Sequence, residues 1–172
     1  MRLKMSLDLR IYDEIKSDHI FFFNDFNNED LASLFYRAYH HSVDDEGESI
    51  KDWISNIIDF KEHKYGELID EASFVMMENN QMVSAIVIGL KDSNPYIISL
   101  VTDPMFRQRG YASTLIRACA AVLKINYKEL ILYVSKENKD AINLYNKFGF
   151  EFVEDYIESD HNDSKSKIAD NE

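Results

Sequence analysis

Apolar and polar residues follow one another along this chain in patterns that predict both strands and helices. Continuous apolar runs, rich in β-branched and aromatic residues, predict buried strands at 82–88, 96–101 and 130–134. Apolar residues recur at helical spacing in four other segments, which are 29–40, 49–64, 113–124 and 139–148. Three more strands are expected: one within 9–23, one at 74–77 that forms a hairpin with 82–88, and a last one at 150–157. The strand at 82–88 is almost entirely apolar, so we expect it in the centre of a sheet.

The stretch 103–112 joins the buried strand at 96–101 to the helix that follows it. Pro104 marks the end of the strand because it has no N–H to donate, and Gly110 lets the backbone turn tightly. The first N–H groups of the helix have no partner within it, and Arg107 and Arg109 stand beside them. The stretch therefore predicts a phosphate-binding site. The alternative is an ordinary turn with solvated arginines.

Two motifs in the second half of the chain resemble those of a known superfamily. The common nucleotide-binding patterns G-x-x-x-x-G-K-[ST] and G-x-G-x-x-G do not occur. Instead, Arg107-x-x-Gly110-x-Ala112 resembles the coenzyme-A-binding motif (Q/R)-x-x-G-x-(G/A) of the GNAT N-acetyltransferase superfamily. The segment 138–150, NKDAINLYNKFGF, resembles the signature N-x-x-A-x-x-(L/F)-Y-x-x-x-G-F of the same superfamily. The two motifs stand in the expected order, one strand–helix unit apart.

The resemblance, which is close over residues 70–157, implies an α/β (α+β) fold of the GNAT type. Such a fold has a mixed, mostly antiparallel central sheet with helices on both faces. Its two central parallel strands splay apart in a V that admits the coenzyme. We expect one acetyltransferase domain over 1–157, and a disordered polar tail over 158–172 because that segment is charged and poor in apolar residues.

The resemblance also implies which residues bind acetyl-CoA, the expected cosubstrate. The pantetheine arm would pair with the backbone of the strand before the loop, at Leu100, Val101 and Thr102. The pyrophosphate would lie in the Arg107 motif, held by main-chain N–H groups of Gln108, Arg109, Gly110, Tyr111, Ala112 and Ser113. Asn138 would hydrogen-bond the pantetheine arm, and Tyr145 would be the general acid that protonates the leaving thiolate.

Asn138 and Tyr145 also have a geometric relation that follows from the sequence. They are seven residues apart, which is two helical turns, or about 10 Å along one face. Both can therefore touch one extended ligand. The structural alternatives are a helix N-cap for Asn138 and a core position for Tyr145.

The implied reaction is transfer of an acetyl group from acetyl-CoA to a primary amine, by direct attack in a ternary complex. The general base is left open, because the strand at 96–102 has no carboxylate and Tyr133 stands where some members of the superfamily have Glu. Glu71 and the loop carboxylates Asp44, Asp45 and Glu46 are candidates. The alternatives are a non-catalytic acetyl-CoA sensor and an acidic protein-interaction module. The acceptor is open, and a homodimer paired through the last strands is what similar proteins suggest.

The formal net charge of −12 and the pI near 4.8 argue against nucleic acid and anionic membranes as partners. They weakly favour a cationic acceptor. The loop at 44–48 carries four carboxylates, which either are simply solvated or attract ammonium groups. The first ten residues contain no apolar leader segment and no run is as long as a membrane span. We therefore expect a cytoplasmic protein.

Two residue types that often carry chemistry are interpreted here as structural. The single cysteine, Cys119, lies on the apolar face of a predicted helix and is expected in the core. His40 and His41 suggest a metal, but neighbouring positions on a helix point about 100° apart. No further ligands follow at zinc-like spacing. No metal site is expected.

Overall fold

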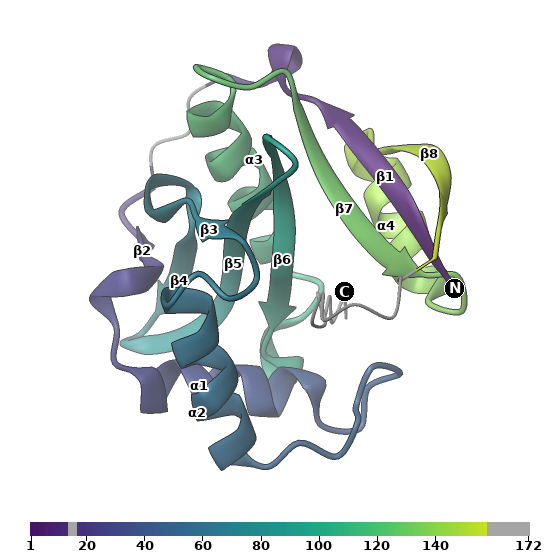
Figure 1. Ribbon diagram of the computed structural model, residues 1–172. Helices are drawn as coiled ribbons and strands as arrows, with labels where there is room; N and C mark the ends of the chain where they lie inside the picture. Colours follow the sequence, from purple (N-terminus) through teal and green to yellow (C-terminus); the bar gives the residue numbers. More distant parts are fainter. Residues whose placement is uncertain (14–16, 158–172) are drawn as a thin grey trace.

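Figure 1 shows the computed structural model of the chain, which describes residues 1–13 and 17–157. The strands are β1 (Arg2–Asp8), β2 (Ile20–Phe22), β3 (Glu67–Leu68), β4 (Phe74–Glu78), β5 (Gln81–Lys91), β6 (Asn94–Thr102), β7 (Glu129–Ser135) and β8 (Glu151–Tyr156). The α-helices are α1 (Asn28–Tyr39), α2 (Ile50–Lys61), α3 (Tyr111–Leu123) and α4 (Lys139–Phe148). Single 3-10 turns are η1 (Leu9–Ile11), η2 (Phe23–Asp25), η3 (Asp70–Ala72) and η4 (Pro104–Phe106).

The strands form one mixed sheet in the order β2-β4-β5-β6-β7-β1-β8, with β3 also paired to β5. Every pairing of named strands is antiparallel except that of β6 with β7. Helices α3 and α4 cover one face of the sheet and α1 and α2 the other (Figure 1), so each face has its own buried core. The expected α/β fold, mostly antiparallel with helices on both faces, is confirmed.

The two parallel strands part soon after they meet. Their register contains one pair, Tyr96 with Ile131, and Figure 1 shows β6 and β7 running in the same general direction and spreading apart toward their arrowheads. On its other side β6 shifts register: Val87 pairs with Ser99 and Ile88 with Ile97, so Ile98 is an extra residue. An extra residue of this kind bends a strand. The bulge lies where β6 leaves β7, which accounts for the V-shaped arrangement.

The core on the side of α1 and α2 is built largely from aromatic rings. Phe35 of α1 packs against Trp53 and Phe60 of α2 with ring centroids 5.6 and 6.0 Å apart. Tyr39 stacks on the same Trp53 at 4.6 Å. Such contacts add about 0.5–1.5 kcal/mol per pair beyond simple burial. They fix α1 against α2, and with them the start of the loop that joins the two helices.

The N-terminal strand was misplaced by the sequence prediction. A first strand was expected within 9–23, which does contain β2, but the chain begins with β1, paired between β7 and β8. Met5 and Leu7 are buried, whereas the polar residues between and around them are more exposed. The alternation that marks a strand with one buried face is therefore present, but basic and acidic residues interrupt it.

Several element boundaries also differ from the prediction. Asn27 caps α1, since its side chain accepts from the Asp30 N–H. Ser49 caps α2 in a capping box with Asp52 instead of being its first residue. Helix α3 begins at Tyr111, two residues earlier than expected. The predicted tail at 158–172 lies outside the described residues. Among the described residues, no helix combines the length and apolar character that crossing a membrane requires.

Candidate functional site

The loop between β6 and α3 takes a backbone path that two left-handed residues define. Gln108 has φ 61° and Gly110 has φ 79°. A Cβ added at Gly110 would meet no atom within 4 Å, so glycine is favoured there by its backbone angle and not by lack of space. Gly110 is the N-cap of α3 and makes no side-chain capping hydrogen bond. The loop therefore delivers an uncapped helix N-terminus at the end of β6.

This N-terminus has the features of an anion site. The first turn of the 13-residue helix contains no acidic residue. The positive end of the helix dipole and the first N–H groups thus favour a negatively charged ligand. Thr114 turns back to donate its hydroxyl to the Gly110 carbonyl at 3.0 Å, and Ala112 is buried against the core.

The two arginines of the motif lie in different surroundings. The exposed Arg109 guanidinium stacks on Phe106, 5.0 Å from the ring centroid. Arg107 is half-buried and donates to the carbonyl of Ala38 in α1 at 3.4 Å. Burial lowers the pKa of Arg107, and the negative charge of Asp103 opposes this. Arg109 thus stays at the surface, while Arg107 contacts α1.

An ion pair that no sequence pattern predicts connects α1 to the same loop. Arg37 donates through Nε to Oδ2 of Asp103 at 2.7 Å and through Nη1 to Ser33 at 2.8 Å. The Asp103 side chain is only 3% exposed and also accepts from the Met105 N–H at 2.9 Å. Because Asp103 caps η4, the pair holds the start of the loop to α1.

Helix α4 carries the second pair of predicted residues. Asn138 is its N-cap and accepts from the Ala141 N–H at 3.1 Å, which is the structural alternative given for it above. Tyr145 is fully buried and meets Phe150 edge-to-face at 5.4 Å. Gly149 ends the helix at φ 99°, as expected of a left-handed C-terminal residue. Roles for Asn138 and Tyr145 in binding and catalysis stay predictions.

The acidic loop between α1 and α2 reaches this helix. Asn138 donates through Nδ2 to Oδ2 of Asp44 at 3.2 Å, between residues 94 apart in the chain. A pocket of about 430 Å³ opens beside Asp44, at the end of β7 and β8. Its lining residues are Met1, Arg2, Asp44, Ser135, Tyr156 and Ile157. Among the open candidates for general base, Asp44 is thus close to the predicted site.

The other carboxylates that are candidates for the general base are less favourably placed for that role. Asp45 accepts from the N–H groups of His41 and Gly47 within its own loop, and these bonds lower its pKa. Glu46 is exposed. Glu71 belongs to η3, between β3 and β4, on the side of β5 that faces away from β6. Two strands therefore separate Glu71 from the gap between β6 and β7.

Tyr133, which stands where some members of the superfamily have Glu, forms an aromatic pair in the structure. Tyr133 lies two residues beyond the Tyr96–Ile131 contact, and its ring centroid is 4.4 Å from that of Tyr156. The Lys91 ammonium lies 5.3 and 5.1 Å from these two rings and donates to the Tyr156 hydroxyl at 3.0 Å. Burial raises the pKa of Tyr133, and Lys91 opposes this.

The sequence model described as the acetyltransferase (GNAT) family matches residues 28–150. This range includes both motifs and the two diverging strands, β6 and β7. The chain belongs to this family. No curated protein sequence matches it.

Solved structures share the fold of this GNAT protein at low sequence identity. A GCN5-related N-acetyltransferase from Sphaerobacter thermophilus is 14% identical with a TM-score of 0.65; the match covers 88% of this chain and 48% of that one. PH1933 from Pyrococcus horikoshii OT3 is 20% identical with a TM-score of 0.64, over 89% and 92% of the two chains. An aminoglycoside 6'-N-acetyltransferase from Acinetobacter haemolyticus is 13% identical with a TM-score of 0.65, over 81% and 95%. This GNAT protein thus spans about half of the Sphaerobacter protein.

Proposed function

We propose that this GNAT protein transfers an acetyl group from acetyl-CoA to a primary amine that binds together with the coenzyme. The observation that carries the proposal is the placement of the two motifs. Strands β6 and β7 part after Tyr96 and Ile131. One strand leads to the uncapped N-terminus of α3, and the other leads to α4 with Asn138 and Tyr145.

The coenzyme fits this arrangement as an extended ligand. The pantetheine arm would pair with the backbone of Leu100, Val101 and Thr102, the part of β6 that lies beyond its contact with β7. The pyrophosphate would lie at the start of α3, from Gln108 to Ser113, where main-chain N–H groups and the helix dipole favour an anion. Arg109 would add a surface charge, while Arg107 would act mainly through its contact with α1.

The residues present suit direct transfer. The amine nitrogen attacks the thioester carbonyl, the carbon–sulfur bond breaks, and Tyr145 donates its hydroxyl proton to the leaving sulfur. The amine proton leaves through water toward the acidic loop, where Asp44 is the nearest candidate acceptor. An acyl-cysteine route is disfavoured because the single cysteine, Cys119, is fully buried and burial raises its pKa.

Solved relatives support an amine acceptor. The aminoglycoside N-acetyltransferase AAC(6')-Iy, 20% identical with a TM-score of 0.61, was crystallised in complex with CoA. It was also crystallised with a bisubstrate analogue that joins CoA to an acetylneamine derivative. Aminoglycosides carry several ammonium groups, and the net charge of −12 in this chain suits a cationic acceptor of that kind.

The first test is a calorimetric titration with acetyl-CoA, followed by a thiol-release assay over a panel of primary amines. Saturable binding with turnover on at least one amine is expected. Binding without turnover on any amine would favour a coenzyme sensor, and absence of binding would contradict the proposal.

A matched pair of glycine variants places the binding site. Gly110 and Gly47 both have positive φ, 79° and 81°, and both have open space around a Cβ. Alanine at either position costs about the same backbone strain, about 1–2 kcal/mol. Gly110→Ala should weaken acetyl-CoA binding at least about threefold, whereas Gly47→Ala should leave the affinity unchanged. Equal acetyl-CoA affinities of the two variants would mean that the coenzyme does not bind at the start of α3.

A further inference from the structure

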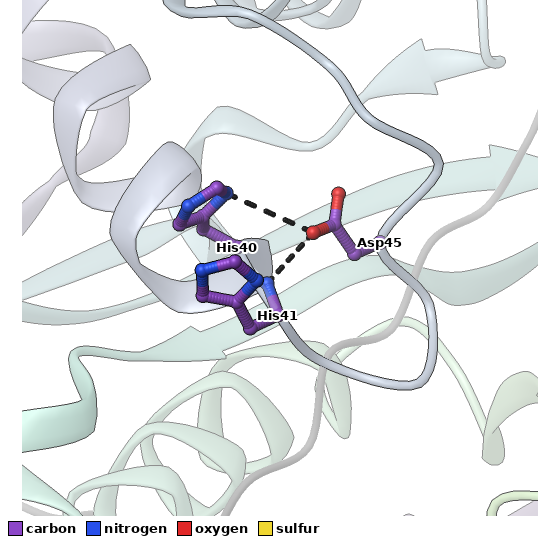
Figure 2. A group of neighbouring side chains, drawn as sticks. All are labelled: His40, His41 and Asp45. Atoms are coloured by element: carbon purple, nitrogen blue, oxygen red, sulfur yellow. Dashed lines mark hydrogen bonds and ion pairs between the residues drawn. The ribbon is translucent and has the colours of Figure 1, made fainter.

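Three potential metal ligands converge at the end of α1. The side chains are those of His40, His41 and Asp45, and their ligand atoms all lie within 4.8 Å of one another (Figure 2). This is the one group of three or more such residues found among the described parts of the chain, 1–13 and 17–157. Both histidines are exposed and Asp45 is half-buried, so a dissolved ion has direct access.

The backbone explains why two adjacent histidines meet. Helix α1 ends at Tyr39, His40 is the C-cap, and His41 takes the left-handed conformation with φ 64°. The angle of about 100° between neighbouring side chains, which argued against a metal, holds only inside a helix. Here the two imidazole centroids are 3.8 Å apart, with planes inclined by 40°. The sequence-based objection therefore does not apply to this pair.

The carboxylate is held in place by the loop itself. Oδ2 of Asp45 accepts from the His41 N–H at 2.7 Å, and Oδ1 accepts from the Gly47 N–H at 2.8 Å. Oδ2 also lies 3.7 Å from Nδ1 of His40. Each carboxylate oxygen keeps a further lone pair for a ligand. Asp45 is thus fixed beside both imidazoles before any ion binds.

We propose that His40, His41 and Asp45 bind one divalent transition-metal ion, for which Zn²⁺ is the probe. Two imidazoles and a carboxylate suit zinc and its neighbours, whereas Mg²⁺ and Ca²⁺ prefer oxygen ligands. Bonds of about 2.0–2.2 Å around a tetrahedral ion require ligand atoms about 3.3 Å apart. Rotation of the exposed imidazoles closes the present spacing. Water completes the coordination.

A bound ion would also act on the neighbouring candidate site. It would tie the end of α1 to the acidic loop at Asp45, and the preceding residue, Asp44, accepts a hydrogen bond from Asn138, the N-cap of α4. The metal would therefore restrain the segment that lies beside Asn138. This consequence concerns the loop alone and stands whether or not the protein transfers acetyl groups.

The test is calorimetric titration of the untagged full chain with ZnCl₂ in a buffer without chelators. We expect one ion per chain for the wild type and no saturable heat with MgCl₂. His40→Ala and His41→Asn should each weaken Zn²⁺ binding at least about tenfold, since ligand networks of this kind lose that much on perturbation. Asparagine is used at position 41 because it tolerates the left-handed conformation.

The matched control is His19, an exposed histidine that is not part of the cluster. His19→Ala should keep the wild-type affinity within about twofold, and the melting temperature of each variant without metal reports that it is folded. Absence of saturable Zn²⁺ binding by the wild type would overturn the proposal. So would unchanged affinity in both cluster variants, or loss of binding in His19→Ala.

Discussion

Two loops flank the diverging strands, and they are held in different ways. The loop at 103–110, which leads into α3, starts at the buried Asp103, which binds both Arg37 and the Met105 N–H. The loop at 40–49, between α1 and α2, is mostly exposed and meets α4 through Asp44 and Asn138. We propose the first as a preformed anion site, whereas the second is a polar segment that hydrogen-bonds within itself and contacts the rest of the protein through Asp44. The proposed coenzyme side is thus built rigidly and the proposed acceptor side loosely.

The largest expected effect concerns the proposed proton donation by Tyr145 to the leaving sulfur of the coenzyme. Tyr145→Phe removes the proposed proton donor and keeps the ring that packs against Phe150. Turnover should fall roughly 10²-fold, as loss of a general acid typically does, while acetyl-CoA affinity stays close to wild type. Steady-state kinetics with the best amine, together with calorimetry, measure the two quantities.

The control for that variant is Tyr127→Phe. Tyr145 is fully buried, and Tyr127, which follows the C-terminal end of α3, is half-buried against the same core. The Tyr127→Phe variant should turn over like the wild type. If Tyr145→Phe does the same, Tyr145 has no part in the mechanism.

A smaller effect is expected from breaking the ion pair between Arg37 of α1 and Asp103, at the start of the loop at 103–110. Arg37→Met removes the partner of Asp103, whose side chain is 3% exposed. Leaving that carboxylate without its partner should lower the free energy of unfolding by about 2 kcal/mol, less than for a fully buried pair because Arg37 is partly in water. Acetyl-CoA affinity should fall about tenfold because the start of the loop loosens.

The matched control is Arg117→Met, which removes an exposed arginine from α3. It should change neither the melting temperature nor the affinity by a measurable amount. A large loss of stability in Arg37→Met with unchanged acetyl-CoA affinity would show that the pair supports the fold but not the loop.

The same contrast explains what the sequence could predict. The path from Pro104 to Ala112 depends on local backbone properties, chiefly the positive φ of Gly110, so a short motif was enough to find it. The Arg37–Asp103 pair joins residues 66 positions apart, and no local pattern marks such a contact. Similarly, His40 and His41 were judged as helical neighbours because the end of α1 could not be placed to one residue.

Strand β1 was missed for a related reason. Its apolar residues alternate correctly, but the strand carries charges at both ends and is held in the sheet by its pairing with β7 and β8. Strand preference reflects packing against neighbours more than the intrinsic choice of residues. The central strands β5 and β6 were easier because both of their faces are buried, which gives nearly continuous apolar runs.

On the loosely held side, the charge of Asp44 should have a modest effect. Asp44→Asn keeps the shape of the side chain and removes its charge. If the acceptor carries several ammonium groups, its KM should rise about two- to fivefold, the size expected for a partly exposed charge pair. The turnover rate should fall as well, because the amide cannot take the amine proton. Acetyl-CoA affinity should not change. Glu46→Gln, an exposed change in the same loop, is the control. An equal rise in KM for a singly charged amine would argue against recognition of the additional ammonium groups by Asp44.

The smallest expected effect is a difference in pH dependence between the N-terminus of α2 and that of α3. At α2, Asp52 accepts from the hydroxyl and the N–H of Ser49 at 2.7 and 2.8 Å, and these bonds lower its pKa below the ordinary value of 3.8. A carboxylate with a lowered pKa stabilises the fold above its ordinary pKa, and this contribution is lost as the pH falls through the lowered value. At α3 the cap is Gly110, which has no side chain to titrate.

Amide signals followed by NMR from pH 6 to pH 2.5 should therefore show the Ser49 N–H changing with a midpoint below 3.8. The Thr114 N–H, bonded to the Gly110 carbonyl at 3.0 Å, should stay constant over the same range. Asp52→Asn should abolish the Ser49 transition, and a midpoint at or above 3.8 would mean that the capping box does not hold the carboxylate in its charged form.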